Sequence, residues 1–311
     1  MNHTEARRQF SRVGFACFAV TFVTYAVLLV AQPLLLSRWP GLLNHPWYVW
    51  ASSSLPLYLC GFPCAALILR KCKKQATPKR DLPLPWFAAA FAVGYTLLLA
   101  GNILGNLLMS VVQAISGLES GNLVADVLAD SDLLGVLIFA VVLAPLMEEW
   151  LFRGLIYDRL AVFGPGWATA LSALLFGLFH GNFYQLFYAV SVGLVLGWLK
   201  ARTGRLIWGI ALHMGINFMG SVVPLWMMDV SLDADSLAAM TPQALAVLVY
   251  STFLLWLTAV GTLMLVKHRK TVLRVLAVDA GPDLWKQVVK APGMWCVLAL
   301  SLVLFLASIL I

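Results

Sequence analysis

The stretch Pro145-Leu-Met-Glu-Glu-Trp-Leu-Phe-Arg153 sets two adjacent carboxylates and an arginine at the end of an apolar run from Leu133 to Met147. Ionisable groups inside a hydrophobic segment are costly and therefore rare. They usually face the interior of a helix bundle or a water-filled cavity, and they mark functional sites. Glu148 and Glu149 are therefore the starting point for both the fold and the candidate site.

The composition of the chain predicts a membrane protein. Of its 311 residues, 61% are hydrophobic and 11% are charged, and the mean hydropathy is +0.88. A soluble domain is about 45–50% apolar and about 25% charged. The net charge of +7 comes from cations that lie between apolar runs, so it indicates topology and attraction to anionic lipid rather than a nucleic-acid partner. We predict an all-α, polytopic transmembrane bundle of about eight or nine helices, in contact with the lipid bilayer.

Nine apolar runs divide the chain into three parts. Residues 1–132 hold three N-terminal runs, residues 133–228 hold four runs that form the candidate catalytic core, and residues 229–311 hold two C-terminal runs. In order, the runs are Val13–Leu36, Trp47–Leu69, Trp86–Ile115, Leu133–Phe152, Trp167–His180, Phe183–Leu199, Leu206–Met228, Ala244–Val266 and Met294–Ile311. Within the third run, Gly101 and Gly105 have the spacing that allows close helix contact.

The distribution of cations predicts the orientation of these runs. If the N-terminus is inside and every run crosses the membrane, all lysines and arginines except Arg38 lie inside, as the positive-inside rule requires. We therefore predict a multi-pass integral membrane protein with a cytoplasmic N-terminus. The basic inner loops and low cysteine use suit a bacterial inner membrane, although an endoplasmic reticulum protein would look similar. The acidic residues expected in outer loops are Glu119, Asp126, Asp130, Asp132, Asp229, Asp233 and Asp235.

Spacing along the helices predicts how the polar groups of the core meet. At about 1.5 Å per residue, Glu148 lies roughly 15 Å inside the inner end of its helix, and His213 and Asn217 lie roughly 12 Å and 18 Å inside theirs. Glu149 and Arg153 are four residues apart, which favours an ion pair, and a buried arginine needs such a partner. Glu148 points about 100° away from Glu149 and is left free as the candidate general base.

Two histidines extend this set. His213 and Asn217 share a helix face, and an imidazole with an amide can stabilise a developing oxyanion; an interhelical hydrogen bond is the alternative interpretation. Phe176 shares a face with His180 and supplies packing. His180 ends a run too short to cross a bilayer. We therefore expect the turn formed by Gly181 and Asn182 to be submerged and covered by protein, which would bring His180 to the depth of the other groups.

Activation of a water molecule for hydrolysis is the chemistry that one glutamate and two histidines fit. The chain contains neither a G-x-S-x-G nor an H-E-x-x-H motif, so these two patterns indicate no serine nucleophile and no zinc-protease helix. Glu148, His180 and His213 could bind Zn²⁺ with one open position, or they could hold the water directly. Zinc is thus a candidate cofactor, with these three residues as its candidate ligands.

The three motifs, in this order, resemble those of the CAAX protease and bacteriocin-processing enzyme family, also called the CPBP or Abi family. The family pattern is E-E-x-x-x-R, then F-x-x-x-H, then H-x-x-x-N or a similar small or polar residue in place of the Asn. The chain has Glu148-Glu149-x-x-x-Arg153, Phe176-x-x-x-His180 and His213-x-x-x-Asn217. The resemblance covers residues 133–228.

This resemblance implies an all-helical intramembrane endopeptidase that acts on a membrane-anchored protein or peptide. By the same resemblance, Glu148 and His180 would activate the attacking water, and His213 and Asn217 would stabilise the oxyanion. The family includes eukaryotic proteases that trim prenylated C-termini and bacterial proteins linked to peptide maturation or bacteriocin immunity.

Two other functions would use the same polar layer. A transporter would line a conduction path with it, but the sequence shows no inverted repeat and no pair of broken helices. A catalytically inert immunity or partner protein would have no need to keep all of these costly polar groups. Asn182, Tyr184 and Gln185, which follow His180, are interpreted mainly as structural residues, with the lining of a substrate groove as the alternative.

Overall fold

The computed structural model describes residues 1–45, 47–118, 121–122, 126–128, 131–227, 241–270 and 282–310. Over these residues the chain is helical and contains no strand, which confirms the predicted all-α fold. Eight of the described helices are long and apolar enough to cross a membrane, and a ninth apolar helix, α9 (Pro165–Phe179), has 15 residues. The eight are α1 (His3–Arg38), α2–η2–α3 (Tyr48–Leu69), α4 (Leu84–Ser116), α6 to η5 (Leu133–Phe163), α10 (Phe183–Thr203), α11–η6–α12 (Ile207–Met227), α14 (Pro242–Lys267) and α17 (Pro292–Leu310).

Two helix boundaries differ from the prediction. Helix α1 begins at His3 rather than near residue 13, and the side chain of Asn2 caps it by accepting the N–H of Glu5 at 2.8 Å. The fourth helix continues to residue 163, because the charged residues after its apolar run find partners. Asp158 pairs with Lys200 at 3.1 Å, and Arg159 donates to the carbonyl of Leu69 at 3.2 Å. The predicted boundary at 228–229 lies outside the described residues, as do Glu119, Asp130, Asp229, Asp233 and Asp235.

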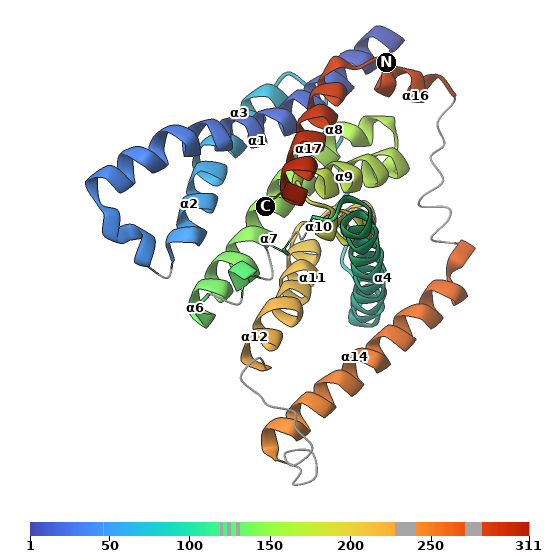
Figure 1. Ribbon diagram of the computed structural model, residues 1–311. Helices are drawn as coiled ribbons and strands as arrows, with labels where there is room; N and C mark the ends of the chain where they lie inside the picture. The colour runs from blue at the N-terminus through green and yellow to red at the C-terminus, as the bar shows by residue number, and fades with distance from the viewer. Residues whose placement is uncertain are drawn as a thin grey trace.

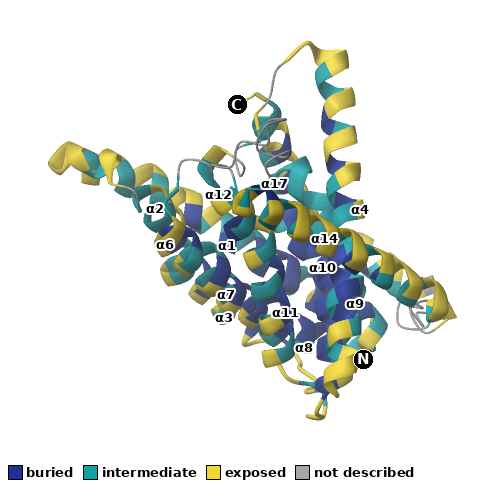
Figure 2. Ribbon diagram, turned by 90° about the horizontal axis from the view of Figure 1, so that it is seen from below, coloured by how far each residue is buried: buried dark blue, intermediate teal, exposed yellow. Residues whose placement is uncertain are grey.

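The helices of the candidate core occupy the centre of the molecule (Figure 1). Helices α9 and α10 pack against each other as a hairpin, α4 packs along α10, and α14 packs along the other side of α4. Helix α1 packs against both α3 and α17. Buried residues concentrate in α8, α9, α10 and α11, whereas the outward faces of α2, α4 and α14 are largely exposed (Figure 2). This distribution is expected of a bundle whose outer apolar surface faces lipid.

The basic segments of the sequence meet at one end of the bundle. The side-chain amide of Gln9 in α1 donates to the carbonyls of Lys73 and Arg159 at 2.7 and 2.8 Å. The backbone N–H of Arg80 donates to the carbonyl of Thr203 at 2.8 Å. The cations of the N-terminus, of residues 70–80 and of residues 200–205 are therefore neighbours, as a shared side of the membrane requires.

Close contact between α4 and α10 depends on two glycines. A Cβ atom on Gly101 would lie 2.6 Å from the backbone of Tyr188, and one on Gly105 would lie 2.9 Å from the carbonyl oxygens of Phe183 and Tyr184. These distances are too short for any side chain. The spacing of Gly101 and Gly105 thus allows close helix contact, as predicted from the sequence.

The turn between α9 and α10 is covered by the last helix. Gly181 forms this turn with a φ of +66° and lies against the side chain of Leu304 in α17. Ser301 donates to the carbonyl of Leu178 at 3.3 Å. Leu304 is twelve residues after Pro292, roughly 18 Å along α17, so the turn packs beside the middle of that helix. Coverage by protein agrees with the expectation, and submersion in the membrane stays a prediction.

Labelling of a cysteine at position 182 tests the submerged turn. In a chain whose five native cysteines are replaced, we expect Asn182→Cys to react slowly with an impermeant maleimide in sealed vesicles and rapidly after full denaturation. Gly41→Cys is the matched control, because Gly41 is exposed and a Cβ there has no neighbour within 4 Å. Equal labelling of the two positions in intact vesicles of either orientation would contradict the submerged turn.

Thermal unfolding in detergent tests the α4–α10 contact. Gly101→Ala should destabilise the fold by about 1–3 kcal/mol, because the added methyl group overpacks a backbone-to-backbone contact. Gly220→Ala serves as the control, since it lies in helical structure and a Cβ there meets nothing within 4 Å. An unchanged midpoint in Gly101→Ala would show that the two helices separate without penalty.

Candidate active site

The two adjacent glutamates lie on a short α-helical segment between two π-helical ones. Helix α7 (Ala144–Glu149) follows η3 (Val136–Leu143) and precedes η4 (Trp150–Ile156). π-Helical turns are rare and frequent at functional sites. They widen the helix on both sides of Glu148 and Glu149, so a simple 3.6-residue repeat does not describe the whole element.

Pro145 has a direct structural consequence for the site. The N–H of Ala144 bonds to the carbonyl of Phe139, and Pro145 has no N–H, so the carbonyl of Ala140 lacks a donor in its own helix. The side-chain amide of Asn217 donates to that carbonyl at 2.8 Å. Asn217 therefore makes the interhelical hydrogen bond considered as the alternative for this residue. Its second amide proton has no partner among the described residues and stays available.

Glu149 and Arg153 form the predicted ion pair in the interior of the bundle. The Nη1 atom of Arg153 lies 2.9 Å from Oε1 of Glu149, and the side chains are 1% and 0% exposed. The Nη2 atom of Arg153 donates to the carbonyl of Gly193 in α10 at 3.1 Å. The guanidinium carbon also lies 4.5 Å from the ring centroid of Phe176, within the range of a cation–π contact. Each charge is thus compensated inside an apolar bundle.

His213 lies between the two glutamates. Its Nδ1 atom is 3.3 Å from Oε1 of Glu149, and its Nε2 atom is 3.8 Å from Oε2 of Glu148. Helix α11 supplies His213 and also Gly209, one turn earlier, where a Cβ would lie only 2.9 Å from Oε2 of Glu149. Glu148 therefore faces a histidine rather than standing alone, and Glu149 contacts His213 as well as Arg153. Spacing could not predict these contacts, because they join different helices.

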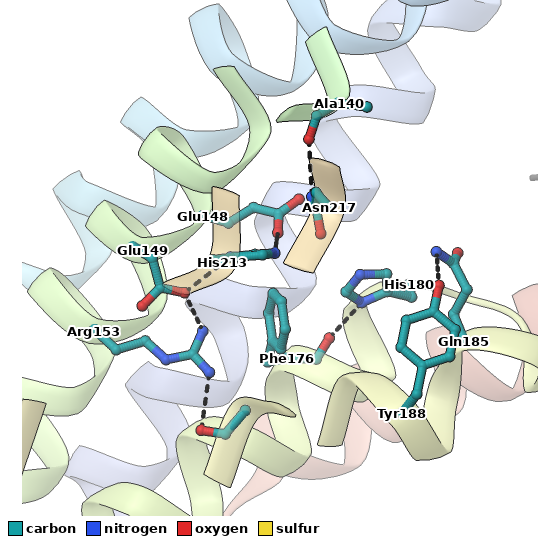
Figure 3. A network of polar contacts seen from close by, with 11 residues as sticks. Ala140, Glu148, Glu149, Arg153, Phe176, His180, Gln185, Tyr188, His213 and Asn217 are labelled. Carbon is teal, nitrogen blue, oxygen red and sulfur yellow. Dashed lines mark hydrogen bonds and ion pairs between the residues drawn. The ribbon is translucent and has the colours of Figure 1, made fainter. Parts of the chain in front are cut away.

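His180 joins the same cluster through Phe176 (Figure 3). The ring of Phe176 packs edge-on to His180 and to His213, with centroid distances of 4.9 and 5.7 Å. The Nδ1 atom of His180 lies 2.8 Å from the carbonyl of Phe176. A carbonyl only accepts, so Nδ1 carries the proton and, in the neutral imidazole, Nε2 keeps its lone pair. His180 is thus set up as a proton acceptor through Nε2.

The candidate zinc ligands do not form a metal-binding group. No three His, Cys, Asp or Glu side chains within the described part of the chain converge in a way that could hold a metal ion. Glu148, His180 and His213 lie in that part, and the bond from Nδ1 of His180 to a carbonyl leaves Nε2 as the ring atom that could bind a metal. The zinc site considered from the sequence stays a prediction.

Sequence reasoning missed one polar residue beside His180. Asn182 caps α10 and contacts Gln185. Gln185 in turn contacts Tyr188 at 2.7 Å (Figure 3). Asn182 and Gln185 were recognisable as neighbours of His180 in sequence, but Tyr188 is two turns away and carries no motif. The hydroxyl of Tyr184 instead lies 3.5 Å from the side-chain amide of Gln113 in α4, so it faces away from this chain of contacts.

Comparison with known proteins gives a family model and a similar protein. A family model described as type II CAAX prenyl endopeptidase Rce1-like matches residues 130–219, which include every motif residue quoted above. The chain is also similar to the UPF0177 protein YxdF of Lactococcus lactis subsp. lactis. It is 29% identical to that protein over 124 residues, which are 39% of this chain and 68% of YxdF. No solved structure matches the chain. The family match confirms the resemblance inferred from the three motifs.

Unfolding in detergent micelles tests the buried ion pair. Glu149→Gln should destabilise the protein by about 3–5 kcal/mol, because it leaves Arg153 charged, buried and uncompensated. The double variant Glu149→Gln with Arg153→Met should recover part of this loss. Glu5→Gln is the control, since Glu5 pairs with Lys73 at the surface and such pairs contribute little. If Glu149→Gln and Glu5→Gln unfold alike, the pair does not organise the core.

Proposed function

We propose, from the match of residues 130–219 to the Rce1-like family model of CAAX endopeptidases, that this protein is an intramembrane endopeptidase that hydrolyses a peptide bond in a membrane-anchored protein or peptide. The observation that carries the proposal is the grouping of His180 and His213 around Phe176, with Glu148 beside His213. Glu148 and His213 are buried in a chain with eight long apolar helices among those described. Water-activating groups at such a position suit hydrolysis of a substrate that reaches the site from the membrane.

Glu148 and His180 are proposed to activate the attacking water. The carboxylate of Glu148 takes a proton from the water as the new C–O bond forms, and Nε2 of His180 accepts the second hydrogen of that water in a hydrogen bond. This role for His180 is supported by the bond from Nδ1 to the carbonyl of Phe176, which leaves Nε2 as the acceptor. Glu148 then returns that proton to the amide nitrogen as the C–N bond breaks and the amine leaves, so the cycle ends with Glu148 ionised.

His213 and Asn217 are proposed to stabilise the oxyanion. The free amide proton of Asn217 is one donor, and the bond to Ala140 holds that amide in place. His213 is the other proposed group and acts through Nε2, while Nδ1 remains on Glu149. Donors held in place before the reaction need no reorganisation when charge develops, which is the source of their effect on rate. Glu149 and Arg153 act as positioning residues through His213 and Phe176.

The sidedness and substrate follow from the same proposal. The basic segments gather at one end of the bundle, which supports a cytoplasmic N-terminus, and we assign the protein to a bacterial inner membrane. The family description names CAAX prenyl endopeptidases, so a lipidated C-terminal peptide is the first substrate to test. No observation favours the transporter or the inert immunity protein.

Peptide cleavage by the purified protein in detergent tests this function. The substrates are a farnesylated peptide ending in a C-a-a-X sequence, the same peptide without lipid, and an unrelated transmembrane peptide, with products identified by mass spectrometry. Glu148→Gln should lower the cleavage rate by about 10²- to 10⁴-fold, because it removes the general base. Glu5→Gln makes the same chemical change at the surface and should retain the wild-type rate.

Folding of each variant is checked by its unfolding midpoint, so that loss of activity is separated from loss of structure. A parallel comparison of peptides from cells that carry wild-type or Glu148→Gln protein covers substrates outside the panel. Cleavage that persists in folded Glu148→Gln would falsify the assigned mechanism. Absence of any wild-type product in both measurements would overturn the enzymatic function.

A further inference from the structure

A chain of side-chain amides leads from His180 to a tyrosine that the mechanism above does not use. The amide nitrogen of Asn182 lies 3.0 Å from the carbonyl of His180 and 2.7 Å from Oε1 of Gln185. The amide nitrogen of Gln185 lies 2.7 Å from the hydroxyl oxygen of Tyr188. Figure 3 shows Tyr188 and Gln185 beside His180, on the opposite side of its ring from Phe176.

The orientation of the Asn182 amide determines which group donates and which accepts in every hydrogen bond of this series. Oδ1 of Asn182 accepts the backbone N–H of Gln185 at 2.9 Å, because Asn182 is the N-cap of α10. The opposite side of that amide must therefore be its NH₂ group, which donates to the carbonyl of His180 and to Oε1 of Gln185. Gln185 in turn must present its own NH₂ group to Tyr188.

The hydroxyl oxygen of Tyr188 is consequently an acceptor in this chain, and its single proton points elsewhere. No acceptor for that proton is found among the described residues. The hydroxyl oxygen already has a partner in Gln185, so what remains unused is its one O–H donor beside His180. Tyr188 is partly buried rather than fully enclosed, which leaves its hydroxyl able to meet a bound molecule.

A further contact holds Tyr188 in place beside His180. Its backbone packs directly against Gly101 of α4, where a Cβ would lie 2.6 Å away, so the residue cannot shift toward that helix. Its hydroxyl is held on the other side by the side-chain amide of Gln185 at 2.7 Å. The donor is therefore fixed beside His180 (Figure 3).

We propose that Tyr188 is a substrate-positioning residue that donates its phenolic proton to a main-chain carbonyl of the peptide bound beside Glu148 and His180. The proposal rests on the endopeptidase function above. A peptide must leave its helical hydrogen bonds to be cleaved, and an unpaired backbone carbonyl away from water is costly. Tyr188 satisfies one such carbonyl, and the Asn182–Gln185 relay ensures that the hydroxyl is a donor when the substrate arrives.

Steady-state kinetics on the peptide cleaved best by the wild type tests the proposal. Tyr188→Phe keeps the ring and removes the proton, so it should lower kcat/KM by about 10- to 100-fold, mainly through KM, since it leaves a desolvated carbonyl unpaired. Gln185→Glu reverses the relay, because a carboxylate accepts the Tyr188 proton, and should raise KM similarly. The double variant should be no worse than Tyr188→Phe alone, because both changes remove the same bond.

Tyr184→Phe is the matched control, since the Tyr184 hydroxyl lies by Gln113 of α4, and it should keep the wild-type KM. Unfolding midpoints are measured for all variants, and Gln185→Glu, which retains the tyrosine, decides the case if Tyr188→Phe is unstable. Wild-type kinetics in folded Tyr188→Phe or Gln185→Glu would overturn the proposed role of Tyr188. Losses that multiply in the double variant would overturn it as well. Either result leaves the endopeptidase function standing. Absence of wild-type cleavage overturns the endopeptidase function and this role with it.

Discussion

The structure depends on one interaction, the ion pair of Glu149 and Arg153 in the interior of the bundle. Both side chains are almost fully removed from solvent, and such charges are tolerated only when each is compensated. Glu149 also contacts His213 on α11, and Arg153 also contacts the carbonyl of Gly193 on α10 and the ring of Phe176 on α9. One pair therefore contacts three neighbouring helices, and it does so beside Glu148, whose own partner is His213.

The backbone makes room for this polar cluster in two ways. Gly193 and Gly209 face the ion pair, where a Cβ would lie 3.2 Å from Nη2 of Arg153 or 2.9 Å from Oε2 of Glu149. Pro145 removes a donor from its own helix and so leaves the carbonyl of Ala140 to Asn217. The same irregularities that would weaken a soluble helix here hold the candidate oxyanion donors in place, which suits a preorganised site.

Several features followed from local rules and could be predicted. The number and type of the helices follow from composition, because only helices satisfy their backbone in lipid without a partner strand. The Glu149–Arg153 pair follows from a four-residue spacing, since residues four apart lie on one helix face. The start of α1 and the end of the fourth helix could not be predicted from local rules. The start of α1 depends on a cap outside the apolar run, and the end of the fourth helix depends on partners from other helices, Lys200 and Leu69.

The sequence by itself determined the all-α membrane fold, the ion pair and the motif residues that match the Rce1-like family. Only the tertiary structure decided that His213 lies between both glutamates, that α17 covers the Gly181 turn, and that Tyr188 ends a directed hydrogen-bond chain beside His180. The physical reason is the distance along the chain over which each kind of contact acts. Periodicity relates residues within one or two turns of a helix, whereas contacts between helices depend on how glycines, prolines and buried charges pack along the whole chain.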